Sequence, residues 1–388
     1  MPPEGPPSRP GEAVLRSLYL HLPFCRARCP YCDFNSRPGS AEERAQYLQA
    51  LRAEVRTAAQ QQGRPPVATV YLGGGTPTVY APEELGDLLA EVRSAFAVTP
   101  DAEVTCEANP GTVDEPSLRV LRASGVNRLS LGVQSLCEQE LRSLGRVHSA
   151  AEALAAIAAA RAAGFTNLCA DLMYGLSGQT VGDWLATLRA VVTLRPEHVS
   201  AYCLTIEEGT ELARRVEAGL VTPLDEDTQA AQFGATHEVL GAAGYEHYEI
   251  SNFALPGRRC RHNLTYWTGA EFVGLGAGAW SYVGGERWGN VRDVSEYVRR
   301  VATGEGPVAE REQLPPERAA AEAIMLGLRT ADGVDLAEVA ARFGVDAVHF
   351  GPAAERLVRD GLLRRDGTHL APTEAGMRLG TDVALAFL

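Results

Sequence analysis

A regular alternation of strand-like and helix-like segments is the feature that most limits the folds open to this chain of 388 residues. From Ser17 onward, short runs rich in β-branched and aromatic residues end in polar or glycine-rich loops, and a helical pattern follows each. Parallel strands need such crossover helices, because a tight turn cannot join a parallel pair. The sequence therefore predicts an α/β fold with a partial or full barrel of six units. We expect strands over 18–22, 68–72, 103–107, 128–133, 168–173 and 198–204, and helices over 41–61, 82–96, 115–123, 150–163 and 182–194.

Polar groups fall directly after these strands, at the positions where a barrel places its active site. A cysteine-bearing loop follows the first strand, a glycine run the second, and single polar residues the next three. Each residue taken alone is ordinary, and a solvated or ion-paired surface role is its default. Their shared location favours a common ligand site. The candidates are Cys25, Cys29, Cys32, Gly74, Gly75, Thr76, Glu107, Gln134, Arg146 and Asp171.

Cys25, Cys29 and Cys32 put three thiols within eight residues of one loop. Thiols so close together can turn their sulfurs toward a shared metal centre, which would then be one ligand short of four. A centre with a free position can bind a reacting molecule, whereas a closed four-ligand site is structural. The alternatives are a zinc site with His21 as a fourth ligand, or unligated thiols. Zinc sites usually pair a Cys-x2-Cys with a second ligand pair, and no second pair with matching spacing follows.

The side chains after the other strands suit a small polar ligand. Glu107 and Asp171 could hold ribose hydroxyls, and the planar fork of Arg146 could bind a carboxylate. The glycine run 73–75 fits a place where bare backbone approaches a ligand, although glycine after a strand often only lets the chain turn. These residues predict a nucleotide-like site beside the cysteines.

Composition excludes some classes of function. A formal charge of −13 would repel a phosphate backbone, so nucleic acid is not an expected partner. No apolar run is long enough for a signal peptide or a membrane span, so we expect a cytoplasmic globular protein with reduced thiols. Residues 1–16, which include five prolines, are predicted to be disordered.

The regular repeat, and with it the barrel of residues 17–244, ends where a segment rich in aromatic residues begins, at 245–314. This segment contains Cys260-Arg-His262-Asn-Leu-Thr-Tyr266-Trp267. A histidine among aromatic residues is more often packed and hydrogen-bonded than a ligand. The same surroundings also suit an axial haem ligand, because an imidazole can bind iron while flat apolar rings cover the macrocycle. Cys260 is a competing soft ligand.

Residues 315–388 predict a small separate domain. Helices are expected over 318–328, 336–343 and 353–360, followed by a hairpin that turns at Asp366-Gly367, which together indicate a winged-helix-like domain. The region carries eight Arg, no Lys and eleven Asp or Glu, whereas a DNA-binding face would have to be basic. A zinc-dependent DNA regulator is therefore disfavoured, and packing or partner docking is expected.

Taken in order, the motifs resemble those of radical S-adenosylmethionine proteins of the coproporphyrinogen-dehydrogenase-like group. The resemblance covers residues 17–388 and rests on His21-Leu-Pro-Phe-Cys25-x3-Cys29-x2-Cys32, Gly73-Gly-Gly-Thr-Pro-Thr78, Glu107-Ala-Asn-Pro, Gly132-Val-Gln-Ser and Asp171-Leu-Met-Tyr-Gly. It implies a partial (β/α)6, TIM-like barrel in which Cys25, Cys29 and Cys32 hold a [4Fe-4S] cluster whose free iron binds S-adenosylmethionine. The residues it implies around that nucleotide are Tyr19, Tyr31, Gly74, Gly75, Thr76, Glu107, Gln134, Arg146, Asp171 and Trp280.

Two branches of this group differ in class: an oxygen-independent coproporphyrinogen III oxidase and the HemW-type haem chaperones. The oxidase pattern continues as Cys-x-Cys and carries a longer N-terminal extension, whereas this chain has Cys32-Asp-Phe34 and only sixteen residues before Ser17. The segment His262-Asn-x2-Tyr266-Trp267 matches the HNxxYW motif associated with haem binding in the chaperones. All three features resemble the chaperone branch.

That branch implies a carrier that binds haem as cargo, through His262, and passes it to apo-haemoproteins such as respiratory enzymes at the cytoplasmic membrane. The cluster and S-adenosylmethionine would then form a regulatory centre, with no catalytic residue assigned. Oxidase activity is not expected, although the intact cofactor motifs keep radical chemistry open. A homodimer and peripheral attachment to the membrane also remain open.

Overall fold

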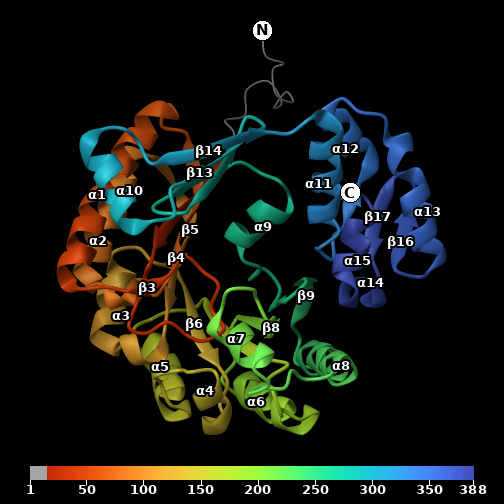
Figure 1. Ribbon diagram of the computed structural model, residues 1–388, viewed down its shortest axis with the longest axis horizontal. Coiled ribbons are helices and arrows are strands. Elements are labelled where there is room, and N and C mark those ends of the chain that lie inside the picture. The colour runs from red at the N-terminus through yellow and green to blue at the C-terminus, as the bar shows by residue number, and fades with distance from the viewer. Residues whose placement is uncertain (1–14) are drawn as a thin grey trace.

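Figure 1 shows the computed structural model, which describes residues 15–388. Its centre is a partial barrel in which six parallel strands lie side by side in chain order, as the sequence predicted. The α/β fold class is therefore confirmed. These strands are β1 (Arg16–Leu22), β4 (Pro66–Gly74), β5 (Ala97–Ala108), β6 (Arg128–Gln134), β7 (Leu168–Tyr174) and β8 (His198–Cys203).

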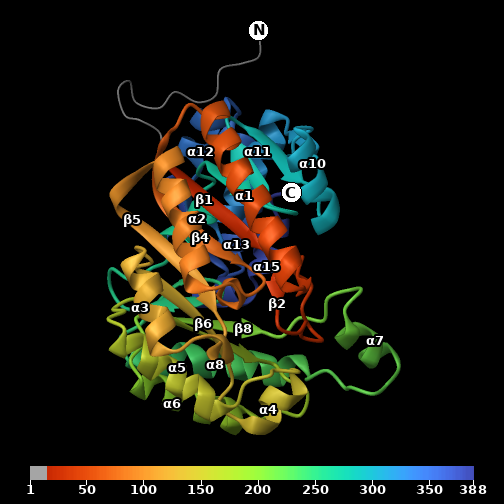
Figure 2. The same cartoon turned by 90° about the vertical axis from the view of Figure 1, so that its left-hand side faces the viewer.

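Crossover helices join consecutive strands and cover the outer face of the sheet (Figures 1 and 2). At the start of the first helix, the Ser40 side chain accepts a hydrogen bond from the Glu43 backbone, and the Glu43 carboxylate accepts one from the Ser40 backbone. This capping box satisfies two amides that would otherwise lack partners. The helices are α1 (Ala41–Gln61), α2 (Pro82–Ala95), α3 (Glu115–Ala123), α5 (Ala150–Ala162) and α6 (Val181–Thr193), with a short α4 (Glu138–Ser143) before α5.

Side chains alternate between the two faces of each strand. In β1, Leu18, Leu20 and Leu22 are fully buried in the core formed with the helices. Tyr19 and His21 point the other way, into the barrel, where the Tyr19 ring lies 6.2 Å from the ring of Tyr71 on β4. The barrel interior is therefore lined by polar and aromatic groups.

The segment after residue 244 adds strands to both edges of the sheet. β9 (Glu246–Glu249) and β10 (Asn252–Ala254) extend it beyond β8, while β11 (Phe272–Leu275) lies parallel to β1 on the other side. The main sheet of the described chain thus has twelve strands, and its outer strands come from the predicted extension. Helices α7 (Glu211–Glu217) and α8 (Glu226–Ala242) precede this segment, and its remaining elements are β12 (Trp280–Val283), β13 (Glu286–Asn290), α10 (Val294–Thr303) and β14 (Val308–Gln313).

Helix α9 (Arg261–Trp267) lies across the N-terminal end of the barrel strands. The Thr265 hydroxyl is 2.8 Å from the Ser17 hydroxyl at the start of β1, and His262 Nδ1 is 2.7 Å from the Thr69 hydroxyl on β4. The backbone N–H of His262 donates to the Glu103 carboxylate on β5 over 3.0 Å. α9 therefore closes the end of the barrel opposite the cysteine loop.

The C-terminal residues form a domain with its own hydrophobic core, in which helices and a hairpin occupy the predicted ranges. The domain rests on α9. Arg342 donates hydrogen bonds to the carbonyls of Thr268 and Gly269, and the Arg329 guanidinium lies 5.5 Å from the centre of the Trp267 ring. Its elements are α11 (Pro316–Gly327), β15 (Val334–Asp335), α12 (Leu336–Phe343), α13 (Gly351–Arg359), β16 (Leu363–Asp366), β17 (His369–Pro372), α14 (Glu374–Arg378) and α15 (Gly380–Leu385).

The start of β1 corrects one sequence prediction. Arg16 was expected in a disordered segment, yet it belongs to the strand and its side chain pairs with Glu271 over 2.9 Å. The ion pair and the ladder to β4 order this residue. Residues 1–14 of the predicted disordered segment lie outside the described residues. Within residues 15–388, no helix has the length and apolar character needed to cross a membrane.

Candidate functional site

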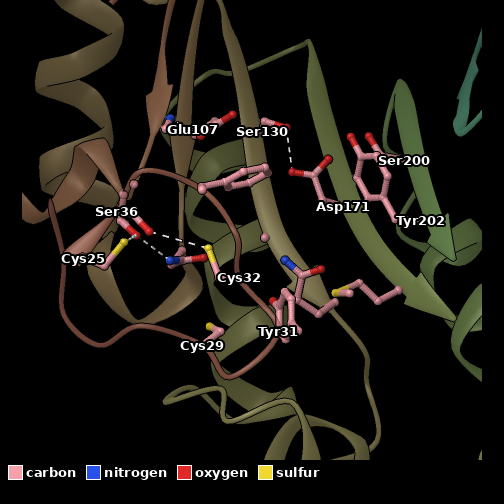
Figure 3. Close-up of a pocket in the computed structure, with 18 of the residues that line it drawn as sticks. Cys25, Cys29, Tyr31, Cys32, Ser36, Glu107, Ser130, Asp171, Ser200 and Tyr202 are labelled. Carbon is pink, nitrogen blue, oxygen red and sulfur yellow. Dashed lines mark hydrogen bonds between the residues drawn. The ribbon is translucent and has the colours of Figure 1, made fainter. Parts of the chain in front are cut away.

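A cavity of about 330 Å³ opens at the C-terminal ends of the parallel strands. Figure 3 shows the cysteine loop on one side of it, and Asp171, Ser200 and Tyr202 on neighbouring strands across from the loop. The cavity brings together most of the residues that the sequence singled out. Those that line it are Cys25, Cys29, Tyr31, Cys32, Gly74, Gly75, Thr76, Glu107, Gln134, Arg146 and Asp171.

Each cysteine sulfur has a different polar neighbour. The hydroxyl of Thr76 donates to Cys25 Sγ over 3.5 Å, and Arg146 Nη1 donates to Cys29 Sγ over 3.5 Å. Cys32 Sγ lies 3.6 Å from the Ser36 hydroxyl. The loop is anchored by a short parallel pairing of β2 (Phe24–Cys25) with β3 (Arg37–Pro38). Hydrogen bonds to sulfur stabilise thiolates and tune the potential of an iron–sulfur cluster.

The donor set of this loop fits a cluster with one open position. The three thiols face one cavity from a single loop. His21, the fourth ligand of the zinc alternative, already has both ring nitrogens in hydrogen bonds, to the Tyr19 hydroxyl over 3.0 Å and to the Asn35 carbonyl over 2.9 Å. Within residues 15–388, no three His, Cys, Asp or Glu side chains converge on a single metal ion.

The glycine run is explained by protein packing as well as by the cavity. A Cβ on Gly75 would lie 2.7 Å from the carbonyl oxygens of Leu22 and Phe24, and one on Gly74 would lie 2.3 Å from His21 Nδ1. Gly74 also has a φ of 103°, which an L-residue rarely adopts. The absence of side chains lets the cysteine loop lie directly on the end of β4, and this contact positions Cys25.

Glu107 is held in place by two donors at the end of β5. The Tyr71 hydroxyl donates to its Oε1 over 2.8 Å, and the Gly74 backbone N–H donates to its Oε2 over 3.1 Å. Burial, with a smaller contribution from the nearby charge of Asp171, raises the pKa of Glu107 from its ordinary 4.5 to about 7. The carboxyl can therefore gain or lose a proton near neutral pH.

Asp171 is oriented from the neighbouring strand and from its own. The Ser130 hydroxyl on β6 donates to Asp171 Oδ2 over 2.8 Å, and the Cys169 thiol donates to Oδ1 over 3.1 Å. Two carboxyl groups, Glu107 and Asp171, thus line the same cavity. They are acceptors for ligand hydroxyls or amines.

Arg146 and Gln134 lie nearer the cysteines. Arg146 Nη2 donates to the Gly132 carbonyl over 2.9 Å and also to the Asn109 side chain. Gln134 ends β6 with a φ of 65°, a left-handed conformation that costs a non-glycine residue about 1 kcal/mol. This backbone directs the end of β6 toward the cavity, so a strained residue sits at the ligand site.

Three predicted residues do not line the cavity. Tyr19 is half-buried beneath it, where its hydroxyl contacts His21. Trp280 is 41% exposed on β12 and packs over Gly289. His262 is only 1% exposed and sits in the floor of the barrel.

The surroundings of His262 leave neither ring nitrogen free for iron. Nδ1 lies 2.7 Å from the Thr69 hydroxyl and Nε2 lies 2.9 Å from the Tyr266 hydroxyl. Burial lowers the pKa of His262 to about 3, so the imidazole is neutral. The competing ligand Cys260 is fully buried, and burial raises the pKa of its thiol to about 12. In this conformation neither residue is presented to haem.

The cavity also contains residues that the sequence did not single out. The signal was present in β6, where Arg128, Ser130 and Gly132 precede Gln134 at intervals of two and therefore share its face. The main additions are Tyr71, Arg128, Ser130, Ser200 and Tyr202, while Phe34 and Asn263, which belong to motifs noted in the sequence, line the cavity as well.

Comparison with known proteins shows which class of protein this chain belongs to. Residues 19–191 match the Radical SAM superfamily, and residues 314–379 match the HemN C-terminal domain. The fold is similar to that of the solved coproporphyrinogen III oxidase HemN from Escherichia coli, a radical SAM enzyme, with a TM-score of 0.85 and 25% identity over 97% of this chain and 90% of that chain. Fold and site together define a radical SAM protein with a HemN-type C-terminal domain.

Curated relatives narrow this class. The haem chaperone HemW of Mycobacterium tuberculosis is 40% identical over 394 residues, which cover 99% of each chain. HemW of Bacillus subtilis is 34% identical over 377 residues, covering 96% of this chain and 99% of its own. The chain therefore belongs to the HemW family of haem chaperones.

Proposed function

We propose that this protein binds haem and transfers it to apo-haemoproteins such as respiratory enzymes, and that a [4Fe-4S] cluster and S-adenosylmethionine bind in the cavity as a regulatory centre. Similarity to HemW chaperones along almost the whole chain supports the proposal. The acceptors would be reached from the cytoplasm, at the surface of the membrane, with no role for nucleic acid. A homodimer is an additional proposal for the oligomeric state.

The position of Phe34 is the observation that favours haem transfer over oxidase activity. It stands two residues after Cys32, lines the cavity, and leaves 64% of its side chain exposed. An exposed aromatic ring at the cavity wall offers a flat apolar surface to a macrocycle, whereas the oxidase pattern has a further cysteine here.

The cavity residues have separate tasks in the proposed regulatory centre. Cys25, Cys29 and Cys32 would hold the cluster, which when bound supplies the electron that can cleave S-adenosylmethionine. Glu107 and Asp171 would accept hydrogen bonds from the ribose hydroxyls. Arg146, already directed toward Cys29, would bind the carboxylate of the same ligand.

His262 is proposed as the haem ligand only after a structural change. Both its nitrogens are hydrogen-bonded, so α9 would have to separate from Thr69 before iron could bind. Haem binding should then be slow, and its observed rate should level off as the haemin concentration rises.

Haemin titration of anaerobically reconstituted protein tests the function. We expect a saturable Soret band that weakens in His262→Ala and is unchanged in the control His148→Ala, whose ring instead lies against the Val133 carbonyl. No saturable band in the native protein would reject haem carriage. A spectrum unaffected by His262→Ala would move the ligand elsewhere.

The second candidate function is oxidative decarboxylation of coproporphyrinogen III. The overall likeness to HemN and the complete cofactor cavity favour it. Incubation of the cluster-loaded protein with S-adenosylmethionine, a reductant and the porphyrinogen would yield protoporphyrinogen if it held. We expect no such product.

A further inference from the structure

Arg128 is a buried guanidinium at the inner end of the cofactor cavity. It begins β6, is 2% exposed, and lines the cavity together with Ser130 of the same strand. Gln134 ends this strand beside the cysteines. Arg128 is on the same face of the strand but six residues earlier, so it lies deeper in the barrel. It belongs to the part of the cavity that faces α9.

The described protein gives this cation no direct counter-ion. None of the ion pairs within residues 15–388 includes Arg128, and its Nε has no hydrogen-bond partner there. The charge of Glu103 raises the pKa of Arg128, but the two side chains form no ion pair. The backbone N–H groups of Arg261 and His262 instead donate to the Glu103 carboxylate over 3.1 and 3.0 Å. A buried charge without a partner is costly, so such groups normally meet an anion or a water network.

The other groups around Arg128 cannot supply a full negative charge. They are the thiols of Cys169 and Cys260, the Tyr71 hydroxyl, and the neutral imidazoles of His198 and His262. Burial raises the pKa of both thiols, which keeps them protonated. Glu107 and Asp171 line the same cavity but form no ion pair with Arg128, and both accept hydrogen bonds from neighbours of their own.

A second polar side chain reaches this end of the cavity from α9. Asn263 lines the cavity, although its neighbours His262 and Thr265 in the same helix are buried in the barrel floor. An amide donor and a guanidinium that line one cavity can together bind a carboxylate through several hydrogen bonds. Ser200 and Tyr202 add hydroxyl groups nearer the mouth of the same cavity, where their strand pairs them with Asp171 and Met173.

We propose that Arg128 and Asn263 form a carboxylate-binding subsite at the inner end of the cavity, distinct from the position of Arg146 beside Cys29. The inference rests on the proposed function for the choice of ligands. Two of them carry carboxylates: haem, through its propionates, and S-adenosylmethionine, through its amino-acid end. The subsite would fix how deep the ligand sits and which way round it enters.

The test compares the native protein with Arg128→Gln, Arg128→Lys and a control, Arg119→Gln, which removes an exposed arginine paired with Glu115 on α3. Each reconstituted protein is titrated with haemin and haemin dimethyl ester, and with S-adenosylmethionine and its decarboxylated form. A lost charge-assisted hydrogen bond predicts an affinity loss of about 10-fold to 100-fold for the free acid of one ligand pair in Arg128→Gln. The ester or decarboxylated partner should be unaffected, and Arg128→Lys should retain part of the affinity.

The outcomes separate the possible sources. Loss confined to haemin assigns a propionate, and loss confined to S-adenosylmethionine assigns its carboxylate; both support the subsite. Equal losses for the free and modified ligands would mean that Arg128 only balances the charges of Glu107 and Asp171, and would overturn it. Retention of full affinity in Arg128→Gln would also overturn it.

The native protein provides a measurement that does not depend on a variant folding. If it binds each modified ligand as tightly as the free acid, no carboxylate is recognised and the subsite is rejected. If it binds no haemin at all, the proposed function fails, and the S-adenosylmethionine pair alone decides the present inference.

Discussion

His262 stacks on Tyr71 inside the barrel, with ring centroids 4.9 Å apart and planes inclined by 27°. Tyr71 in turn donates a 2.8 Å hydrogen bond to Glu107. The histidine of the HNxxYW segment is thus separated from a cofactor-cavity carboxylate by a single side chain. A motif that the sequence places more than 150 residues after Glu107 is therefore in physical contact with the same site.

Replacing His262 should destabilise the free protein. His262→Ala removes the stacked ring and leaves the buried hydroxyls of Thr69 and Tyr266 without this partner. We expect a decrease of about 2–4 kcal/mol in the free energy of unfolding. Urea denaturation measures it, with His349→Ala, at an exposed position of the C-terminal domain, as the control. Equal stability of the two variants would show that the ring does not hold α9 on the barrel.

The cysteine loop should account for all bound iron and sulfide. Cys25→Ala, Cys29→Ala and Cys32→Ala are each expected to lose most of the cluster absorbance after anaerobic reconstitution, since each removes one of the three proposed thiolate ligands. Cys137→Ala removes a partly exposed thiol outside the cavity and should load normally. Zinc in place of iron and sulfide would instead favour the structural alternative.

Binding of S-adenosylmethionine should weaken as the pH falls through about 7, where Glu107 takes up a proton. The neutral acid is a poorer acceptor for ribose hydroxyls than the carboxylate. Equilibrium dialysis between pH 6 and pH 8 should show this in the native protein, whereas Glu107→Gln should bind weakly with little pH dependence. A parallel pH profile in Glu107→Gln would assign the titration to another group.

The raised pKa of Glu107 also predicts how the free energy of unfolding depends on pH. The pKa of Glu107 is raised on folding, so its contribution is fully present below its ordinary 4.5 and is lost as the pH rises through about 7. Glu107→Gln should therefore gain stability relative to the native protein more at pH 8 than at pH 5. Thermal unfolding at the two pH values checks this difference.

Gln134 should show a separation of stability from binding. Gln134→Gly relieves the strain of the left-handed backbone in the folded state, but it also raises the conformational entropy of the unfolded chain. These two effects oppose each other, so the free energy of unfolding should change by less than about 1 kcal/mol. Affinity for S-adenosylmethionine should fall by about 10-fold, since a ligand hydrogen bond is lost. Arg195→Gly, which has a φ of 50° away from the cavity, should match the stability effect without the loss of affinity.

Local patterns predicted the barrel strands and the cavity residues at their ends. Strand period, turn glycines and cysteine spacing are encoded over a few residues, so Cys25, Glu107 and Asp171 could be placed at one edge of the sheet. Arg128 was not predicted, because site residues are expected at strand ends and Arg128 begins its strand, although it stands two residues before Ser130 and so shares its face.

Long-range placements could not be read in the same way. The sequence pattern of residues 272–275 does not indicate that β11 pairs with β1. The sequence pattern of α9 likewise does not indicate that this helix closes the end of the barrel. These positions depend on which buried surface remains uncovered once the barrel has formed. The aromatic neighbours of His262 fitted both packing and haem ligation, and the structure in this conformation has the packed arrangement.

The contacts of Arg329 and Arg342 with the end of α9 have a thermodynamic consequence. α9 is held between the barrel on one side and the C-terminal domain on the other, so any ligand that displaces it must disturb both. Linkage between two binding sites is reciprocal. If a molecule that binds the C-terminal domain weakens these contacts, it changes the affinity of the protein for that ligand, and the ligand changes the affinity for the molecule by the same factor. An acceptor protein docking on this domain would thereby alter how tightly haem is held, without touching the haem itself.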